Sequence, residues 1–489
     1  MIYAIKLARA AVKMKIGKNI INKCKREGAE IVGFGKSNIP LTDFLLSAGV
    51  RRITVRDSKD LEADASARYV IQKYRLRGVV FIFGKNYLDN LAGGVIFRTP
   101  GIRPDVAEFK KAVSKGALLT SEMELFFALC PAHMIGVTGS DGKTTTTTLI
   151  YKLLSECCTG SGKKIGLGGN IGVPLLPRAY ELRSEDFAVT ELSSFQLMTM
   201  TAAPATAVIT NMSPNHLNWH RDMNEYRDAK VNIIGEGCRR AILNYNNEYT
   251  RAVAERTKAE VIWFTSRSVP DTLDNVVCID DGEMVLRRKN IEISLLPLDK
   301  IKIPGTHNIE NYMAAIAAVY DLVPYEALVP AASSLASTFS GVEHRLELVR
   351  EFKRVKFYNG SIDSTPSRTA AALSALPGER ISLICGGYDK NIPFAPLADA
   401  IAEHGGVVSV TLTGATAQKI KSAFDESGKS MPPYEIIDDF DDAVLHAANE
   451  AFELGAEAVP LSPACASFDR FSNFEERGSR FKQLINQIK

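Results

Sequence analysis

A short apolar strand, a glycine-rich loop and a helix follow one another between residues 134 and 156, and this unit constrains the fold more than any other feature. The loop sequence is GVTGSDGKTTT, from Gly136 to Thr146. Glycines let backbone N–H groups turn toward phosphate oxygens, and the positive end of the following helix adds to the attraction. The unit therefore predicts a nucleotide-binding site at the edge of an α/β sheet.

The spacing of the loop departs slightly from the usual G-x-x-x-x-G-K-[ST] pattern, because Val137 stands where the first glycine belongs and Gly136 lies one residue earlier. Lys143 is expected to reach the β- and γ-phosphates of ATP, and the Thr144 hydroxyl to bind Mg²⁺. The alternative is a chance strand–loop–helix arrangement that binds no nucleotide. The ATP-binding residues predicted in this loop are Gly139, Ser140, Asp141, Gly142, Lys143, Thr144 and Thr145.

The length of 489 residues is enough for about three domains. Hydrophobic residues make up 46% and charged residues 24%, which is typical of a globular protein. Lys and Arg number 59 against 56 Asp and Glu, and the net charge of +3 argues against a nucleic-acid-binding protein. The eight cysteines include no C-x-x-C pair, which favours reduced thiols over disulfides or a zinc site. We expect a cytoplasmic protein that acts as a monomer.

The first 26 residues carry eight Lys or Arg and no acidic residue. Lys6, Arg9 and Lys13 interrupt the apolar positions, which argues against a signal peptide, and no apolar run has the length of about 18 residues that a transmembrane segment needs. Two interpretations remain for residues 1–26. They form a helix packed on its own domain, or a basic amphipathic helix that makes weak contact with an anionic membrane surface.

Short apolar runs that end in glycine or polar residues alternate with segments of helical spacing. This alternation predicts parallel sheets with helical connections, and ligands of such folds bind at the carboxyl ends of the strands. We expect three α/β domains in series, over residues 1–121, 122–340 and 341–489. The runs that predict strands are 29–35, 51–58, 78–84, 93–102, 134–139, 186–194, 206–216, 355–361, 380–387 and 407–414, and 41–50 predicts a helix.

Several further motifs follow the phosphate loop in a fixed order. They are GGNIGVP (168–174), TELSSFQL (190–197), NMSPNHLNWH (211–220), YRDAK (226–230), PGTHNIENYMAA (304–315), GVEHRLE (341–347) and LSPACASFDRFSNFEERG (461–478). Together with GSDGKTT they resemble the Mur ligase family over nearly the whole chain. The resemblance implies a Rossmann-like N-terminal domain that binds UDP, a central P-loop ATPase-type parallel sheet, and a C-terminal Rossmann-like domain that binds an amino acid.

The chemistry implied by this resemblance is amide-bond formation driven by ATP. A carboxylate is a poor electrophile, so phosphoryl transfer from ATP first gives an acyl phosphate, which the amine of the second substrate then attacks. Several anions have to be brought together, and metal ions or cationic side chains are the physical remedy. The resemblance implies a catalytic role for Lys143 and two Mg²⁺ sites near it.

Three residues of the central domain resemble the metal-binding residues of the family. Glu191 ends the strand DFAVTE and is implied to be a magnesium ligand, His216 comes after the strand TAVITN and is implied to bind the second metal, and Lys230 is implied to carry a carbamate formed from CO₂. A carbamate turns a cation into an oxygen ligand that suits magnesium. The alternatives are a surface carboxylate, a loop histidine and a solvated helix lysine.

Other residues resemble the nucleotide contacts of the family at the junction of the predicted second and third domains. His307, Asn308 and Asn311 are implied to lie on the adenine side. Arg345 is implied to meet the ATP phosphates when the third domain closes and excludes water from the acyl phosphate.

The N-terminal sequence GFGKSN (33–38) is half of a dinucleotide fingerprint, since Asn38 replaces its third glycine. By resemblance, this region holds the UDP part of the substrate, and the muramoyl-alanine end is bound by the central domain. The alternative is a tight turn without a ligand. The implied substrate contacts are Gly35, Ser37, Asn38, Asp57, Asn170, Ser193 and Gln196.

The segment SPACASFDRFSNFEERG resembles the branch of the family that adds D-glutamate to UDP-N-acetylmuramoyl-L-alanine. The D-N-P-R motif of the diaminopimelate-adding branch is absent from the sequence. Packing and capping of the last helix is the alternative role for Ser467 and Phe474. The implied D-glutamate contacts are Ser364, Lys390, Ser467 and Phe474.

One departure from the family concerns the run NGSIDST. Gly360 stands where the family usually has an Asp that helps to hold the nucleotide, Ile362 stands where many relatives have a lysine, and Asp363 follows in the same loop as a candidate replacement for the missing acid. Two alternative functions therefore remain. They are a related ligase with another amino acid, such as a folylpolyglutamate-type enzyme, and a nucleotide-binding protein without turnover.

Overall fold

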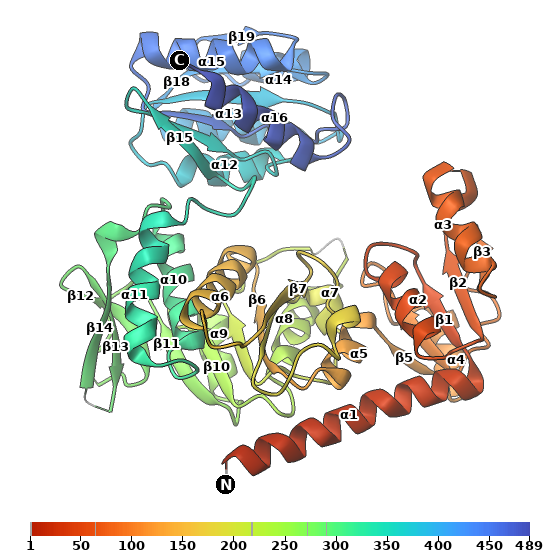
Figure 1. The fold of residues 1–489 in the computed structure, drawn as a ribbon. Helices are drawn as coiled ribbons and strands as arrows, with labels where there is room; N and C mark the ends of the chain where they lie inside the picture. The colour runs from red at the N-terminus through yellow and green to blue at the C-terminus, as the bar shows by residue number, and fades with distance from the viewer. Residues whose placement is uncertain (1, 64, 217–218, 271, 290) are drawn as a thin grey trace. The chain divides into compact units, whose positions relative to one another are not determined.

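The computed structural model describes residues 2–63, 65–216, 219–270, 272–289 and 291–489, with side chains described from residue 14 onward except at 65 and 66. The chain divides into two compact units. The first comprises residues 1–298 and 309–335, and the second comprises residues 299–308 and 336–489. Three β-sheets, two in the first unit and one in the second, confirm the predicted α/β class (Figure 1).

The first sheet is parallel and has the strand order β3-β2-β1-β4-β5, as in Rossmann-like folds. Its central strand, β1, is fully buried because AEIV is flanked by a strand on each side. The elements of this part are α1 (Ile2–Glu27), β1 (Ala29–Val32), α2 (Asn38–Ser47), β2 (Ile53–Asp57), α3 (Ala65–Arg75), β3 (Val80–Phe83), β4 (Val95–Arg98), α4 (Ala107–Ser114), β5 (Leu118–Thr120) and α5 (Glu122–Leu129).

The second sheet has the order β14-β13-β12-β11-β10-β9-β6-β8-β7. It is parallel from β7 to β12 and antiparallel from β12 to β14, so the expected parallel sheet is extended by a three-stranded meander. Its elements are β6 (His133–Thr138), α6 (Lys143–Cys157), β7 (Ile165–Gly169), β8 (Phe187–Glu191), α7 (Ser194–Leu197), β9 (Thr206–Ile209), α8 (Met223–Val231), β10 (Arg240–Asn244), α9 (Glu248–Ala254), β11 (Glu260–Phe264), β12 (Val276–Asp280), β13 (Glu283–Arg288), β14 (Ile291–Pro297), α10 (Thr306–Val319) and α11 (Tyr325–Thr338).

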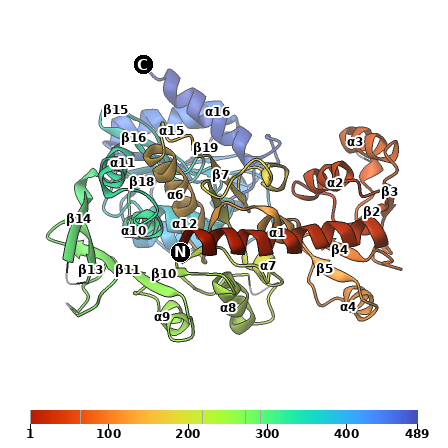
Figure 2. The same cartoon turned by 60° about the horizontal axis from the view of Figure 1, so that its bottom comes forward.

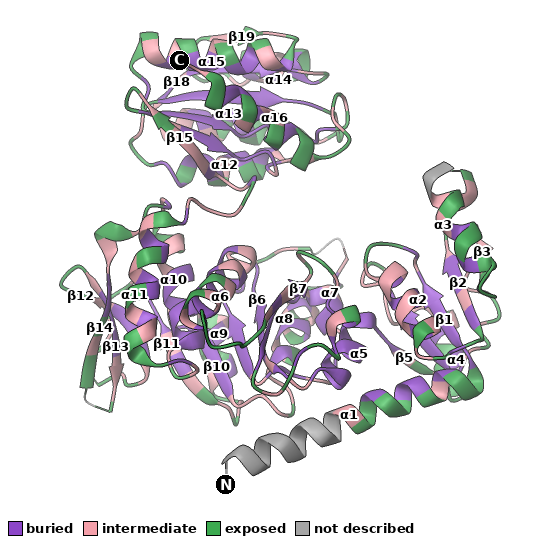
Figure 3. Ribbon diagram, viewed as in Figure 1, coloured by how far each residue is buried: buried purple, intermediate pink, exposed green. Residues whose placement is uncertain are grey.

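The third sheet has the order β15-β16-β20-β17-β18-β19 and is parallel except for the hairpin of β15 and β16. Buried residues line the strands of all three sheets, and exposed residues gather on the outer faces of the helices (Figure 3). The elements of this unit are β15 (Glu347–Phe352), β16 (Val355–Asn359), α12 (Pro366–Ser374), β17 (Ile381–Gly386), α13 (Ala395–His404), β18 (Val407–Thr413), α14 (Ala417–Glu426), β19 (Tyr434–Ile436), α15 (Phe440–Leu454), β20 (Ala458–Leu461) and α16 (Phe474–Gln487).

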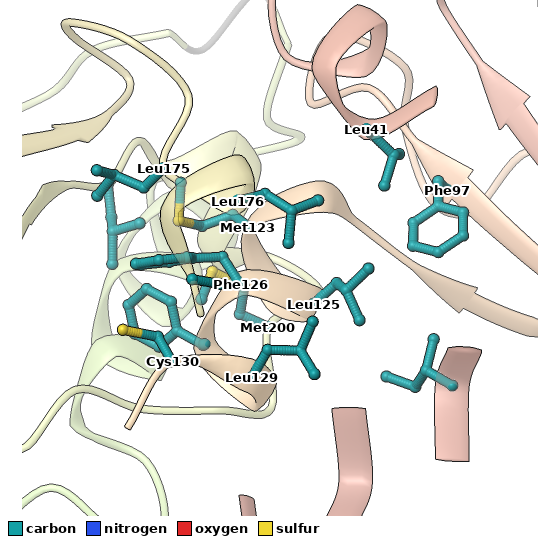
Figure 4. Packing of buried hydrophobic residues seen from close by; sticks show 14 of the residues in the cluster. Leu41, Phe97, Met123, Leu125, Phe126, Leu129, Cys130, Leu175, Leu176 and Met200 are labelled. Atoms are coloured by element: carbon teal, nitrogen blue, oxygen red, sulfur yellow. The ribbon is translucent and has the colours of Figure 1, made fainter. Parts of the chain in front are cut away.

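The first two sheets share one hydrophobic core, in which the apolar helix α5 is the link. All eight residues of α5 are buried, because the helix contacts apolar side chains from both sheets. Figure 4 shows Leu125 and Leu129 on the side of Leu41 and Phe97, and Phe126 on the side of Leu175. Burial of this kind contributes about 25 cal/mol per Å² of apolar surface, so α5 stabilises the junction of the two sheets.

Arg98, the last residue of β4, strengthens the same junction. Its buried guanidinium donates hydrogen bonds to Thr99 O, Pro100 O and Ile102 O in the following turn. The other terminal nitrogen donates to Phe195 O at 2.9 Å and to Thr199 Oγ1 at 3.1 Å, which belong to α7 and the turn after it. The first sheet is therefore tied to the second by a buried polar contact as well as by the apolar core.

The helix α1 is a single uninterrupted helix (Figure 2). Its second half packs on the core of its own unit through Ile20, Ile21 and Cys24, and Gly17 lies against Leu129 of α5. Residues 14–27 thus match the interpretation of a helix packed on its own domain. The side chains of residues 1–13, to which the membrane-surface interpretation also refers, lie outside the described residues. Among the helices that the structure describes, none is long and apolar enough to cross a membrane.

Candidate active site

The phosphate loop connects β6 to α6 at the carboxyl edge of the second sheet, where the neighbouring strands β8 and β9 also end. Two of its glycines are required by their surroundings. Gly142 has φ +76°, and a Cβ there would lie 2.3 Å from Asn311 Oδ1. A Cβ on Gly139 would lie 1.8 Å from Thr210 Oγ1. The loop can approach its neighbours this closely only because both residues lack a side chain.

The loop is held in shape by its own side chains and by the turn after β9. Ser140 Oγ lies 2.9 Å from the Tyr226 hydroxyl and donates to Ser213 O at 2.9 Å. The Asp141 N–H donates to Asn211 Oδ1 at 3.0 Å. Lys143 Nζ folds back and donates to Gly139 O at 3.0 Å and to Ser140 O at 2.9 Å. These contacts place the lysine over the loop and at the positive N-terminal end of α6, as a phosphate site requires.

Glu191 lies at the end of β8 and is almost fully buried. Its Oε2 accepts a hydrogen bond from Thr144 Oγ1 at 2.7 Å, and its Oε1 accepts one from Asn170 Nδ2 at 2.8 Å. The structure therefore brings together three residues that lie far apart in the sequence. A hydroxyl and a carboxylate oxygen in contact beside a phosphate loop are the donor types that Mg²⁺ prefers, so these two residues fit a magnesium ion.

Lys230 lies in α8 and is 1% exposed, which makes it the most unusual ionisable group of the site. Its Nζ donates to Gly139 O at 2.5 Å and to Thr138 Oγ1 at 3.4 Å, and it lies 4.7 Å from the centre of the Tyr226 ring. Burial, with a smaller contribution from Lys143, lowers its pKa well below the ordinary value for lysine. The neutral amine is therefore much more populated here than on a solvated lysine.

His216 has a positive φ of 55° and is exposed, and its ring lies 5.0 Å from that of Phe195. A second histidine was not anticipated from the sequence. His220 is buried, its Nε2 lies 2.9 Å from Ser194 Oγ, and burial lowers its pKa. Among the described residues, no group of three or more His, Cys, Asp or Glu side chains is arranged as a metal site, so the second-metal role of His216 stays a prediction.

The residues predicted to contact the nucleotide on its adenine side, together with Arg345, belong to different units. Asn311 lies in the first unit, where its Oδ1 accepts a hydrogen bond from Thr146 Oγ1 at 3.1 Å, behind the phosphate loop. Asn308 lies in the segment 299–308 of the second unit, where its Nδ2 donates to Pro304 O at 2.5 Å. The backbone N–H of Arg345 donates to Val342 O at 2.9 Å within the second unit. Their contact with nucleotide stays a prediction.

In the first sheet, the predicted UDP-binding turn is closed by its own polar groups. Asp57 Oδ2 accepts from the Phe34 N–H at 2.9 Å, which joins the ends of β1 and β2. Asn38 is buried and its amide donates to Gly33 O at 2.7 Å and to Val32 O at 3.3 Å. Asn38 thus closes the turn at the position of the missing third glycine. Gly35 is exposed and Ser37 is half-buried at the start of α2.

Two of the residues predicted at the muramoyl-alanine end form a capping box. The Ser193 hydroxyl accepts from the Gln196 N–H, and the Gln196 side chain accepts from the Ser193 N–H at 2.9 Å. This pair satisfies the first amides of the short helix α7 directly after Glu191. Asn170, the third residue, is exposed and bonded to Glu191.

The residues predicted to bind D-glutamate lie in the second unit at the carboxyl edge of the third sheet. Lys390 Nζ donates to Ser364 Oγ at 3.0 Å, so two of the four are in direct contact. Ser467 is buried, and its carbonyl accepts from the Phe471 N–H at 2.9 Å. Phe474 begins α16, and its ring packs edge-on against His344 with ring centres 5.9 Å apart.

Arg477 connects the two segments that carry these residues, although it was not anticipated from the sequence. It is 2% exposed, and its Nη2 donates to Ser361 O at 2.8 Å and to Cys465 O at 3.0 Å. Its Nη1 donates to Ala466 O at 2.9 Å. The buried guanidinium thereby fixes the NGSIDST loop against the SPACAS segment.

Gly360 and Asp363 occupy one tightly packed turn. The Asp363 N–H donates to Gly360 O at 2.8 Å, and a Cβ on Gly360 would lie 2.6 Å from Asp363 Oδ2. Asp363 is buried, and its Oδ2 accepts from Ser462 Oγ at 2.9 Å. Burial raises its pKa to about 6. The carboxylate of Asp363 thus lies directly beside the place where a side chain of residue 360 would begin.

Comparison with known proteins gives one matching family description, the Mur ligase middle domain, over residues 137–319. The chain is 44% identical over 474 residues to the UDP-N-acetylmuramoylalanine–D-glutamate ligase of Acetivibrio thermocellus, covering 95% of this chain and 97% of that one. It is 44% identical over 473 residues to the enzyme of the same name from Ruminiclostridium cellulolyticum, with the same coverage. The enzyme of that name from Clostridium novyi is 43% identical over 465 residues, covering 94% and 96%.

Solved structures match the fold at lower identity. A UDP-N-acetylmuramate–alanine ligase from Thermotoga maritima has a TM-score of 0.53 at 17% identity, covering 94% of this chain and 99% of that one. A UDP-N-acetylmuramoyl-L-alanyl-D-glutamate–2,6-diaminopimelate ligase has a TM-score of 0.51 at 17% identity, covering 86% and 89%. Both matches support the fold described above.

Proposed function

This chain belongs to the Mur ligase family and catalyses the ATP-dependent addition of D-glutamate to UDP-N-acetylmuramoyl-L-alanine in peptidoglycan synthesis, and we propose that the residues described above perform this reaction. The observation that carries the assignment of the site is the contact of Thr144 with Glu191 at 2.7 Å beside the phosphate loop, together with the buried Lys230, which donates to Gly139 O of the same loop.

ATP binds with its phosphates at the N-terminal end of α6. Lys143 turns from its loop carbonyls to the β- and γ-phosphates, and the charge that develops on the transferred phosphoryl group is stabilised by this lysine and by the helix dipole. Thr144 and Glu191 would hold Mg²⁺, and the ion would supply positive charge beside the phosphates. The phosphoryl group passes to the carboxylate of the L-alanyl group, and ADP is the leaving group. The product of this step is the acyl phosphate.

Lys230 carries a carbamate in the active enzyme. A neutral amine reacts with CO₂, and the burial of Lys230 favours the neutral form. The carbamate would supply oxygen ligands for a second metal ion, and His216 would be the other protein ligand of that ion. His216 is exposed next to the Phe195 ring, where it is accessible to such an ion.

The incoming amino acid binds in the second unit. Ser364 and Lys390 receive its side-chain carboxylate, and Ser467 and Phe474 border the rest of the molecule. Its amine, once deprotonated, attacks the acyl phosphate and displaces phosphate, which forms the amide bond. The nucleotide contacts of Asn308, Asn311 and Arg345, and the UDP contacts of Gly35, Ser37, Asn38, Asp57, Asn170, Ser193 and Gln196, complete the proposed site. We place this monomeric enzyme in the cytoplasm, where nucleotide-linked precursors and ATP are available.

Phosphate release by the purified chain tests the proposal. With UDP-N-acetylmuramoyl-L-alanine, ATP and Mg²⁺, release should depend on D-glutamate and remain at background with L-glutamate. Thr144→Val with Glu191→Gln should lower the affinity for Mg²⁺ measured by titration, because both oxygen donors are altered. Phosphate release without D-glutamate dependence, in protein that binds ATP, would contradict the proposal.

Gly360 favours one second candidate, an ATP-binding protein that does not turn over. The expected acid is missing at that position, but the carboxylate of Asp363 lies 2.6 Å from where a Cβ of residue 360 would stand. This proximity supports an active enzyme. Tight ATP binding with no phosphate release from any set of amino-acid and nucleotide-linked substrates would support the second candidate.

A further inference from the structure

Arg368 is a cation of the second unit to which neither the sequence pattern nor the family resemblance assigns a role. It lies in the first turns of α12, is exposed, and donates from Nη1 to Ile362 O at 2.9 Å. The same carbonyl accepts from the Ser364 N–H at 2.8 Å. Arg368 and the backbone of Ser364 are therefore joined through one oxygen atom.

Lys390 approaches the same residue from another segment, because its Nζ donates to Ser364 Oγ at 3.0 Å. Lys390, from the loop after β17, thus contacts the side chain of Ser364, and Arg368, from α12, contacts the carbonyl that accepts from the Ser364 N–H. The two cations are close enough to interact, because the pKa of Lys390 is lowered mainly by burial and, to a smaller extent, by the charge of Arg368. Two cations this close repel each other, and an anion bound between them would offset the repulsion.

Neither cation has a direct carboxylate partner in the part of the chain that the structure describes. Among the residues that the structure describes, no ion pair joins Arg368 or Lys390 to a carboxylate, and Asp389 beside Lys390 pairs with Lys419 at 2.9 Å instead. The buried carboxylate of Asp363 attracts Arg368 but forms no ion pair with it, and it accepts a hydrogen bond from the Ser462 hydroxyl. The two cations therefore form an anion site that the folded chain leaves to a ligand.

We propose that Arg368 and Lys390 together bind the side-chain carboxylate of the incoming D-glutamate, and that Arg368 makes the enzyme selective for an amino acid with a second carboxylate. This inference rests on the proposed function. The hydrogen bond to Ile362 O fixes one edge of the guanidinium, and its remaining N–H groups form the fork that suits a carboxylate. Arg368 is a specificity-determining residue in this arrangement and takes no part in proton or phosphoryl transfer.

The test is the kinetics of Arg368→Gln in the full chain, with phosphate release as the readout and D-glutamate as the varied substrate. The KM for D-glutamate should rise about 10- to 100-fold, the effect of losing one charge-assisted hydrogen bond. The KM values for ATP and UDP-N-acetylmuramoyl-L-alanine should stay unchanged. The preference in kcat/KM for D-glutamate over D-glutamine, whose side chain is a neutral amide, should fall about tenfold or more.

Two matched variants complete the test. Arg368→Lys keeps the charge and should lose less than Arg368→Gln. Arg380→Gln removes another exposed arginine that donates to backbone carbonyls, those of Leu454 and Gly455, and should leave all constants unchanged. If the unaltered enzyme uses D-glutamate and Arg368→Gln keeps its KM and its preference, the role of Arg368 is refuted. If the unaltered enzyme releases no phosphate with D-glutamate, the proposed function itself is refuted.

Discussion

Lys230 and Gly139 are 91 residues apart in the sequence, and the ammonium nitrogen of the lysine lies 2.5 Å from the carbonyl oxygen of the glycine. The lysine side chain, which belongs to α8, thereby contacts the backbone of the phosphate loop. A carbamate on this nitrogen is negatively charged, so it must turn away from the carbonyl, and a cation is needed to hold it. We therefore expect the proposed modification of Lys230 and the binding of a metal ion to be coupled.

Lys230→Ala is expected to lose nearly all activity, because the buried ligand position is left empty. Addition of millimolar acetate or another short carboxylate should restore much of it, since the anion can occupy the place of the carbamate. Phosphate release with and without the carboxylate measures the rescue. Full activity of the unrescued variant would contradict the carbamate, and so would the absence of the expected mass increase on Lys230 in native mass spectrometry of protein equilibrated with bicarbonate.

Lys143→Ala should reduce phosphate release by about a thousandfold or more, the scale of losing a charge that stabilises phosphoryl transfer. The matched control is Lys152→Ala, an exposed lysine on the same helix, which should keep normal activity. Equal unfolding curves of the two variants would show that the loss is chemical. Normal turnover by Lys143→Ala would remove the phosphate-loop assignment.

The stability of the second unit should depend on the ionisation of Asp363. Its pKa is raised from the ordinary 3.8 to about 6, because burial outweighs the attraction of Arg368, Arg345 and Arg477. The folded state therefore holds the proton more tightly than the unfolded state, and the stability that this provides is fully present below pH 4 and is lost as the pH rises through about 6.

Asp363→Asn should accordingly raise the free energy of unfolding at pH 7.5 by about 2–3 kcal/mol, and the difference should vanish below about pH 4. Urea unfolding at both pH values, followed in the transition of the second unit, measures it. We expect the same variant to lose activity, because a carboxylate that lowers stability is retained for function. If Asp363→Asn is fully active and is as stable as the unaltered protein at both pH values, Asp363 neither lowers the stability at pH 7.5 nor takes part in the function.

Arg98→Met should destabilise the first unit by about 3 kcal/mol or more, since it leaves the buried acceptors of α7 and of the turn after β4 without donors. Thermal unfolding measures the loss. Arg52→Met is the control, because that exposed arginine bonds only to Arg26 O at the surface. A change in stability within about 0.5 kcal/mol for Arg98→Met would show that the apolar contacts of α5 hold the junction alone.

The parts of the fold that could be predicted from the sequence are those with strong local signals. The glycine loop, the strand before it and the helix after it lie where the pattern places them, because backbone geometry and apolar spacing are local properties. The antiparallel strands β12 to β14 were not anticipated, because their pairing depends on turns in a polar stretch without a helical pattern. The boundaries of three domains stay a prediction, since contacts divide the chain into two units.

For the site, the sequence identified residues by type and by position at strand ends, and the structure brings Thr144, Glu191 and Asn170 into contact as such positions suggest. Arg98 and Arg477 were missed because nothing local distinguishes a buried arginine from an exposed one. Each of them also donates to carbonyl groups that are distant along the chain, Arg98 to Phe195 O and Arg477 to Ser361 O. Asn38 shows the opposite case, since a residue predicted to meet the ligand also closes its own turn.

The shared core of α5 and the buried Arg98 have one more consequence for the acceptor substrate. They hold the two sheets of the first unit as one body, with the proposed uridine site on one sheet and the phosphate loop on the other. The distance between these two proposed sites should then limit the length of the acceptor. We expect an acceptor whose carboxylate lies too near to its nucleotide, or too far from it, to fail to reach the γ-phosphate, so that substrates of the wrong length are rejected before phosphoryl transfer.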